Sequence, residues 1–574
     1  MNILETYLKK IQDLIIANCN SLKIESDISF SGSVVETPPQ EINFDLSSNI
    51  ALVLAKQTKQ PPAKLAESLK KLILENLDDF SEITIAGPGF INFKFTMKMY
   101  QKLIISILES NKKYGSNNKS ETYNIEFVSA NPTGPMHVGH SRGAIFGDVL
   151  ANLLIFNGNN VTKEYYINDY GNQIINFTES VFYRLREIEF NEKFPNQENL
   201  YPGEYVIDIA KNILKDFQKL DLSNFKKIFD MLSRESLKHS MNLIKADLKA
   251  LGISHDNFIS EKSLVEMNLV EKAIQNLKNK KFVEEGYLNP PRGEENKDWK
   301  KIKRLIFKST LFGDDTDRAL QKNDGTWTYF ANDVAYHSDK ISRNYNYLIN
   351  ILGADHTGYI KRITAAVKAL SNNKTILICK VCQLVKLFKG GKPYKMSKRA
   401  GDFISVKELL DEVDKDSIRF MMLNRSNDVE LDFDFDKVLE KTRENPVFYV
   451  QYCYARISSV FRNVNLDINK DLNIDNYDFE YNIDEIRILK KIAEWPKCIE
   501  VASLRLEPHR IPVYLYELAS EFHSYWNMGK DDPSKRFIND KKEIPNSKLV
   551  LLKVISYVVR SGMDIVGVST PEKM

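Results

Sequence analysis

The pattern of hydrophobic and polar positions changes around residue 130, from a continuous apolar run to helical spacing. Residues 125–130 form a short apolar run that ends in a proline- and glycine-rich loop, as expected of a buried strand. From residue 141 to 156 the apolar positions repeat with helical spacing, and Gly158 follows as a stop signal. The pattern therefore predicts a strand, a turn and a helix, the unit from which open α/β sheets are built.

Patterns elsewhere divide the chain into three parts. Residues 1–118 begin with an amphipathic helix and include, at 85–93, a glycine turn into an alternating strand. Residues 119–404 carry the strand and helix described above. Long amphipathic segments follow, so we expect a helical domain over 405–574.

Two histidines lie where the predicted helix begins. His137 and His140 follow the carboxyl end of the predicted strand, where unpaired N–H groups and the helix dipole attract phosphate. Each imidazole can donate to an oxygen that gains charge during attack on a phosphate, and one such donor contributes roughly 3–4 kcal/mol. Gly139 would let an adenosine approach the backbone. Histidines at this spacing also serve as simple helix caps, so the motif alone does not distinguish a phosphate-binding role from a capping role.

A second motif is a glycine-flanked cationic loop at residues 390–401. Lys395 and Lys398 suit a leaving pyrophosphate, because an ammonium group is a compact charge that can follow a moving polyphosphate. Solvated surface loops are often equally basic. The two motifs are about 250 residues apart, far more than the ~30 residues of a βαβ unit, so we expect an insertion at about 185–290.

Composition narrows the class of protein. The chain has 574 residues, 43% hydrophobic and 27% charged, without an apolar run of membrane-spanning length, which predicts a large cytoplasmic enzyme. A net charge of +3 means that nucleic acid would have to bind through local basic clusters. Cys379 and Cys382 lie in a strand-like stretch without further ligands, so we expect reduced packing thiols and no protein-bound metal.

Taken together, the two motifs resemble the signatures of class I aminoacyl-tRNA synthetases. The first reads His137-Val138-Gly139-His140 with Val for Ile, and the second reads Lys395-Met396-Ser397-Lys398-Arg399 with Arg for the final Ser. The surrounding sequence resembles arginyl-tRNA synthetases over nearly the whole chain, at residues 85–92, 126–142, 165–173, 329–337, 353–359, 445–456 and 567–574. Many arginyl enzymes lack the second lysine, which this chain keeps as Lys398.

The resemblance implies a multidomain α/β fold. Its parts would be a Rossmann-like class I catalytic domain with an insertion, an α+β N-terminal added domain that contacts tRNA, and an all-α anticodon-binding bundle. It also implies activation of arginine by ATP to arginyl-adenylate and pyrophosphate, followed by transfer to the 3′ end of tRNA(Arg). Magnesium would arrive with ATP. The expected partners are arginine, ATP and tRNA(Arg), with no membrane, and the expected state is a monomer.

The resemblance also assigns site residues. The implied catalytic groups are His137, His140, Lys395 and Lys398. ATP would lie along Asn131, Pro132, Thr133, Gly134, Pro135, Met136, His137, Val138, Gly139, His140, Met396 and Ser397. Arginine would be held by Glu126, Tyr329 and Asp333, with its amino and carboxylate end at Asn131 and His356. The residues expected to contact tRNA are Tyr454, Arg456 and Arg462, placed off an apolar stripe of Tyr449, Tyr452, Ile457 and Val460.

Several alternatives stay open at this point. Taken singly, Tyr329 could be a core aromatic, Asp333 a helix cap and Glu126 a strand-end surface charge. A cysteinyl or glutamyl synthetase would require a zinc pocket or a different amino-acid pocket. A non-catalytic, synthetase-derived RNA-binding paralogue would be expected to show damage at the signature histidines or lysines, and these are intact.

Overall fold

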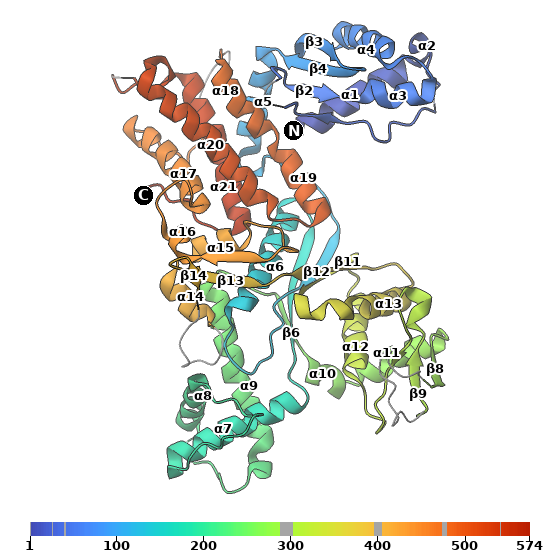
Figure 1. Cartoon of the computed structure of the whole chain (residues 1–574), viewed down its shortest axis with the longest axis vertical. Coiled ribbons are helices and arrows are strands. Elements are labelled where there is room, and N and C mark those ends of the chain that lie inside the picture. The colour runs from blue at the N-terminus through green and yellow to red at the C-terminus, as the bar shows by residue number, and fades with distance from the viewer. Residues whose placement is uncertain are drawn as a thin grey trace. The chain divides into compact units, whose positions relative to one another are not determined.

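The computed structural model describes residues 2–574 apart from 26, 40–41, 218, 288–301, 395–403, 473–478 and 540. The chain forms two compact units, one of Met1–Asn117 with Lys441–Met574 and one of Asn118–Glu440 (Figure 1). The first and last parts of the sequence therefore fold together, and the middle part folds by itself.

The unit Asn118–Glu440 is built on a parallel sheet of strand order β12-β11-β5-β6-β7. Ile125 in β5 is fully buried and pairs with Ile349 of β11 on one side and Lys163 of β6 on the other. The chain order runs outward in opposite directions from β5 and β11, which makes their carboxyl ends the switch point where open α/β sheets bind ligands. The predicted α/β sheet is confirmed, with the strands β5 (Thr122–Glu126), β6 (Asn160–Ile167), β7 (Asn257–Ser260), β11 (Tyr347–Gly353) and β12 (Ile376–Cys382).

Helix α6 (Val138–Phe156) connects β5 to β6 and is buried over most of its length. It confirms the predicted helix and begins three residues before the apolar period does. The strand, however, ends at Glu126 and not at residue 130. Val128 and Ser129 have φ of 69° and 41°, a left-handed conformation that a strand does not accommodate.

Two groups of elements are inserted in the sheet. Between β6 and β7, α7 (Asn172–Phe190), α8 (Glu204–Asp216) and α9 (Phe225–Ala250) share one apolar core. The region expected as one insertion, about 185–290, is therefore divided, because β7 lies within it and pairs with β6 of the parallel sheet. Between β7 and β11 follow α10 (Glu261–Glu266), α11 (Leu269–Asn279), β8 (Val283–Gly286), β9 (Arg304–Phe307), β10 (Arg318–Ala319) and α12 (Tyr329–Ser342), with β8, β9 and β10 forming an antiparallel sheet.

The end of this unit forms a small sheet beside the main one. Helix α13 (Ile360–Ser371) leads from β11 into β12, after which the strand-like stretch predicted over the cysteine pair continues as a separate strand, β13 (Val385–Lys389). That strand pairs with β14 and, in parallel, with β15. The remaining elements are β14 (Lys392–Pro393), α14 (Val406–Glu412), α15 (Lys415–Met422), β15 (Leu431–Asp434) and α16 (Phe435–Leu439).

The N-terminal part of the other unit is an antiparallel sheet of order β1-β2-β4-β3 covered by helices (Figure 1). The amphipathic N-terminal helix is confirmed as α1 (Ile3–Ala17), which buries Tyr7, Ile11 and Ile15. The predicted glycine turn joins β3 to β4. The other elements of this part are α2 (Cys19–Leu22), β1 (Val35–Glu36), β2 (Leu46–Ser48), α3 (Ile50–Thr58), α4 (Pro62–Asn76), β3 (Phe80–Ala86), β4 (Phe90–Phe95) and α5 (Met97–Ser110).

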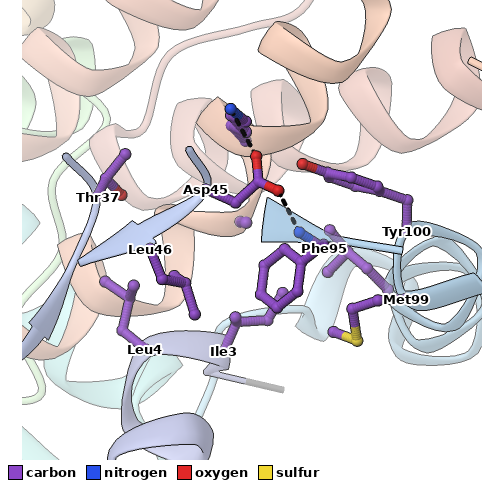
Figure 2. Close-up of a pocket in the computed structure, with 11 residues that line it drawn as sticks. Ile3, Leu4, Thr37, Asp45, Leu46, Phe95, Met99 and Tyr100 are labelled. Carbon is purple, nitrogen blue, oxygen red and sulfur yellow. Dashed lines mark hydrogen bonds and ion pairs between the residues drawn. The ribbon is translucent and has the colours of Figure 1, made fainter. Parts of the chain in front are cut away.

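The C-terminal part of the same unit is the predicted helical bundle, formed by α17 (Pro446–Asn463), α18 (Ile483–Ala493), α19 (Trp495–Arg505), α20 (Arg510–Asp531) and α21 (Asn546–Val566). A polar contact joins it to the N-terminal sheet. Asp45 accepts the backbone N–H of Phe95 at 2.6 Å and pairs with Lys490 of α18 at 2.5 Å (Figure 2). A buried carboxylate with both partners in place favours one docking geometry of sheet and bundle.

Candidate active site

The loop after β5 keeps a strained backbone at the carboxyl edge of the sheet. Val128 is β-branched and left-handed, a combination that persists only where the surroundings impose it. The N–H of Tyr166 donates to Oγ of Ser129 at 3.1 Å, and the hydroxyl of Tyr165 donates to the carbonyl of Ala130 at 2.8 Å. Strand β6 therefore fixes the path by which the chain reaches the histidines.

His137 and His140 cap the first turn of α6 reciprocally. The N–H of His137 donates to Nδ1 of His140 at 3.3 Å, and the two rings stack with centroids 3.7 Å apart. Burial lowers the pKa of both side chains, that of His140 to about 4, so both are neutral near pH 7. Since Nδ1 of His140 accepts, its proton lies on Nε2, where it can be donated to a phosphate oxygen.

Gly139 lies directly against the ring of His137. A Cβ at this position would lie 2.8 Å from Cε1 of His137, closer than carbon atoms approach. The ring of His137 thus borders the backbone of Gly139, against which an adenosine is expected to lie. The capping role and a chemical role of the histidines are compatible, because capping engages Nδ1 of His140 and leaves Nε2 available.

The chain that follows the second signature pairs with the first. The N–H of Val138 donates to the carbonyl of Ile404, and the N–H of Val406 donates to the carbonyl of Met136, each at 2.9 Å. The signature residues Lys395, Met396, Ser397 and Lys398 themselves lie outside the described residues. The segment that follows the second signature is therefore joined to the first signature by backbone hydrogen bonds.

Asp333 lies one turn into α12, beside other acidic groups. Its carboxylate accepts the hydroxyl of Tyr359, and nearby Glu261 accepts the amide of Asn332 at 2.8 Å. Burial, followed by the charges of Glu261 and Glu126, raises the pKa of Asp333 to about 7, although the Tyr359 hydroxyl opposes this. Burial likewise raises the pKa of Glu261 to about 7. Carboxyl groups held together at this cost are stabilised when a cation joins them.

Glu126, the third acidic residue, already has a cationic partner. Its Oε2 pairs with Nζ of Lys340 at 2.5 Å, and its Oε1 accepts the hydroxyl of Ser129 at 3.2 Å. Lys340 is fully buried and also donates to Asn350 at 3.3 Å. The Lys340 ammonium neutralises much of the Glu126 charge. Asp333 and Glu261 instead accept hydrogen bonds from the neutral side chains of Tyr359 and Asn332.

The other residues expected to hold arginine lie nearer the surface. Tyr329 begins α12 and is 61% exposed, so the alternative of a core aromatic is wrong. Asn131 is exposed, and its Oδ1 accepts the amide of Asn168 at 3.2 Å. His356 follows β11, is exposed, and has Nε2 at 3.4 Å from Asp355. The structure thus brings the two histidines together and groups the carboxylates, while these three side chains are exposed.

Sequence reasoning missed Glu261, Tyr359 and Lys340. Lys340 had a detectable signal, because it falls at the buried positions of α12 where an apolar residue is expected. Glu261 and Tyr359 had none, since each reaches Asp333 or its neighbour from another element.

The cysteine pair behaves as packing residues of β12. Cys379 is half-buried and Cys382 buried, and burial raises the pKa of both thiols to about 12. In the described part of the chain, no cluster of three or more His, Cys, Asp or Glu side chains could hold a metal ion. A search of the same residues finds no helix long and apolar enough to cross a membrane.

In the bundle, the stripe predicted on α17 is wrong in detail. Tyr454 is 2% exposed and cannot offer its ring to a base, whereas Tyr449 and Tyr452 are half-buried. The guanidinium of Arg456 lies 4.2 Å from the Tyr452 ring and contacts His523 at 2.9 Å. Arg462 is exposed and donates to the carbonyl of Glu572 at 2.8 Å.

Comparison with known proteins identifies the family of this chain. Residues 103–459 match the family described as tRNA synthetases class I (R), catalytic domain, which places the chain among the class I aminoacyl-tRNA synthetases. Residues 9–95 match the arginyl tRNA synthetase N terminal domain, and residues 450–574 match the DALR anticodon binding domain. The chain belongs to the arginyl-tRNA synthetase family, and it is a ligase of that class.

Individual relatives agree over the full length. The arginine–tRNA ligase of Pelagibacter ubique is 60% identical, covering 100% of both chains, and that of Roseobacter denitrificans is 43% identical over 96% of both. The Thermus thermophilus arginyl-tRNA synthetase structure superposes with a TM-score of 0.70 at 19% identity, covering 99% of this chain and 100% of its own, which bears on the fold alone.

Proposed function

We propose that this chain joins ATP and arginine at the carboxyl edge of the β5–β11 switch point and charges tRNA(Arg) with the product. The observation that supports it most directly is the reciprocal cap of His137 and His140, which presents Nε2–H of His140 at a helix N-terminus. The cluster of Asp333 and Glu261 supplies the matching cation site on the other inserted elements.

In this mechanism the carboxylate of arginine attacks the α-phosphate of ATP. A bond forms between the carboxylate oxygen and phosphorus, and pyrophosphate leaves. The 3′-terminal ribose hydroxyl of tRNA then takes the arginyl group and releases AMP. His137 and His140 contribute N–H donors to the oxygens that gain charge, and no side-chain nucleophile is required. Lys395 and Lys398 are proposed to meet the pyrophosphate.

Arginine selectivity follows from charge and shape. A guanidinium is planar, permanently charged and rich in donors, so a pair of carboxyl groups with fixed acceptors favours it over the lysine ammonium. We assign this role to Asp333, with Tyr329 at the rim and Glu126 acting through its pair with Lys340. Asn131 and His356 are assigned to the amino and carboxylate end.

Several further assignments accompany this proposal. Mg²⁺ enters with ATP, because it prefers phosphate oxygens and water to a protein cage. The bundle reads tRNA through Arg456 and Arg462, and the N-terminal domain, 1–118, contacts tRNA outside the anticodon. The functional domains would be 1–118, 119–404 with its insertion, and 405–574, although residues 405–440 fold with the unit before them. The enzyme would act in the cytoplasm as a monomer.

Arginine-dependent exchange between ATP and pyrophosphate, measured with and without tRNA(Arg), tests the proposal. Lysine and citrulline are the control substrates, since lysine keeps the charge without the fork and citrulline keeps the shape without the charge. We expect exchange with arginine and not with lysine or citrulline. We also expect His140→Ala to abolish exchange while the affinity for tRNA is retained. Absence of exchange under both conditions would indicate an RNA-binding protein without activation.

A further inference from the structure

Two side chains of the helices inserted between β6 and β7 contact the ATP loop, defined as residues 131–136. Tyr205, the second residue of α8, donates its hydroxyl to the carbonyl of Thr133 at 2.9 Å. Its ring lies against Gly134, where an added Cβ would be 2.9 Å from Cζ. Gly203 leaves room for the same ring from the other side, since a Cβ there would be 2.4 Å from it.

Asp247 of α9 holds the end of the same loop. Its Oδ2 accepts the N–H of Met136 at 2.9 Å, immediately before the capping histidine. Met136 is fully buried. A half-buried carboxylate facing a backbone N–H makes a charge-assisted hydrogen bond, which is stronger and more directional than a neutral one.

Both backbone polar groups of Met136, its N–H and its carbonyl, are hydrogen-bonded. Asp247 binds its N–H, while Val406 donates to its carbonyl at 2.9 Å. The residue that follows is the cap of α6, so the orientation of these peptide groups sets where the His137 and His140 rings stand. A shift of about 1 Å in such a constellation is enough to reduce catalysis strongly.

We propose that Tyr205 and Asp247 are positioning residues for the ATP loop, so that the helices α7–α9 form part of the activation machinery and not only a structural insertion. This inference rests on the proposed function of the loop. Neither side chain needs to touch ATP. Each acts through the backbone of residues 133–136.

The test compares Tyr205→Phe, Asp247→Asn and Asp247→Ala in arginine-dependent ATP/pyrophosphate exchange with tRNA present. Tyr205→Phe keeps the ring on Gly134 and removes one hydrogen bond, so kcat/KM for ATP should fall about 3- to 10-fold. Asp247→Ala should lower it about 10- to 100-fold, and Asp247→Asn, which keeps an acceptor oxygen, should recover most of that loss.

Matched controls come from the same inserted helices. Tyr183→Phe loses a hydroxyl that donates to Glu179 at 3.2 Å, and Asp208→Asn removes the charge of a side chain that is 74% exposed; both should keep wild-type kinetics. Melting temperatures measured in parallel separate positioning from stability, because a purely structural role lowers Tm and leaves kcat/KM of the folded enzyme unchanged.

The outcomes also distinguish failure of the positioning role from failure of the proposed active site. If His140→Ala abolishes exchange while Tyr205→Phe and Asp247→Ala stay within twofold of wild type, the positioning role is wrong and the site stands. If His140→Ala retains exchange, the assignment of the site itself fails.

Discussion

At the scale of single residues, the proposed site depends on the protonation states that burial imposes on its polar groups. Neutral histidines can donate a hydrogen bond without repelling the magnesium that accompanies ATP. Asp333 is the complementary case, because its raised pKa leaves it half-protonated near neutral pH until a guanidinium stabilises the ionised form.

This predicts that arginine affinity depends on pH. Below about pH 7 Asp333 takes up a proton and loses the charge that attracts arginine, so the Kd for arginine should rise as pH falls from 8 to 6. His140 does not titrate in this window, since burial lowers its pKa to about 4, and burial lowers the pKa of His137 as well. Glu261, whose pKa burial raises to about 7, takes up a proton in the same window and adds to the effect. Isothermal titration of arginine into the enzyme–tRNA complex across this range provides the measurement.

The variant Asp333→Asn should bind arginine weakly at every pH and keep only the part of the pH dependence that Glu261 contributes. Asp339→Asn, on the same helix and paired with Arg343 at 3.1 Å, is the matched control and should keep the wild-type profile. A wild-type Kd that does not change between pH 6 and 8 would exclude Asp333 as the titrating group.

At the scale of elements, α6 connects the histidines to the segments around the second signature. Two residues beyond His140, the buried Arg142 donates to the carbonyls of Gln383, Ser426 and Val429 at 2.7–3.0 Å. A guanidinium is suited to this task, because its donors diverge in one plane and can serve several carbonyls at once.

Arg142→Lys should therefore both destabilise the protein and slow activation. A lysine cannot reach all three carbonyls, and each buried acceptor left without a donor costs about 1–3 kcal/mol. Urea denaturation should show a lower midpoint, and exchange activity should fall further than stability at 25 °C explains. Arg234→Lys, on α9 with a side chain 71% exposed, should change neither quantity.

The sequence could predict elements where one period dominates over many residues. Helix α6 and the strand before it follow from such runs, whereas the rest of the sheet is expected from the family resemblance. On α17 aromatic residues occur on several faces, so periodicity could not separate the buried Tyr454 from the half-buried Tyr452. Lys340 and Glu126 are 214 residues apart in sequence, so no local pattern could predict that they form an ion pair.

At the scale of the whole molecule, recognition of tRNA must depend on local charge. A net charge of +3 gives little long-range attraction, so the affinity for tRNA should arise at clusters such as Arg456 with its neighbouring rings. Arg456 also lies 5.1 Å from the ring of Trp526, which makes a surface of alternating cation and aromatic groups.

We expect Arg456→Ala to weaken tRNA binding by about 5- to 50-fold, as loss of one stacked base does. Filter binding at several salt concentrations provides the measurement. Arg487→Ala, which removes an exposed pair with Glu521 elsewhere in the bundle, should leave the Kd unchanged. Equal effects of both variants would indicate a general charge contribution in place of a specific contact.

The left-handed backbone at Val128 sets thermal tolerance and catalysis against each other. A β-branched residue in this conformation stores about 1–3 kcal/mol, so Val128→Gly should relieve strain and raise Tm. The same change frees the chain that leads to the histidines, and kcat/KM for ATP should fall. Selection for heat resistance alone would therefore favour glycine at position 128, whereas selection for growth rate would retain valine. A library of variants at this position, screened separately for heat resistance and for growth rate, should enrich different residues in the two screens.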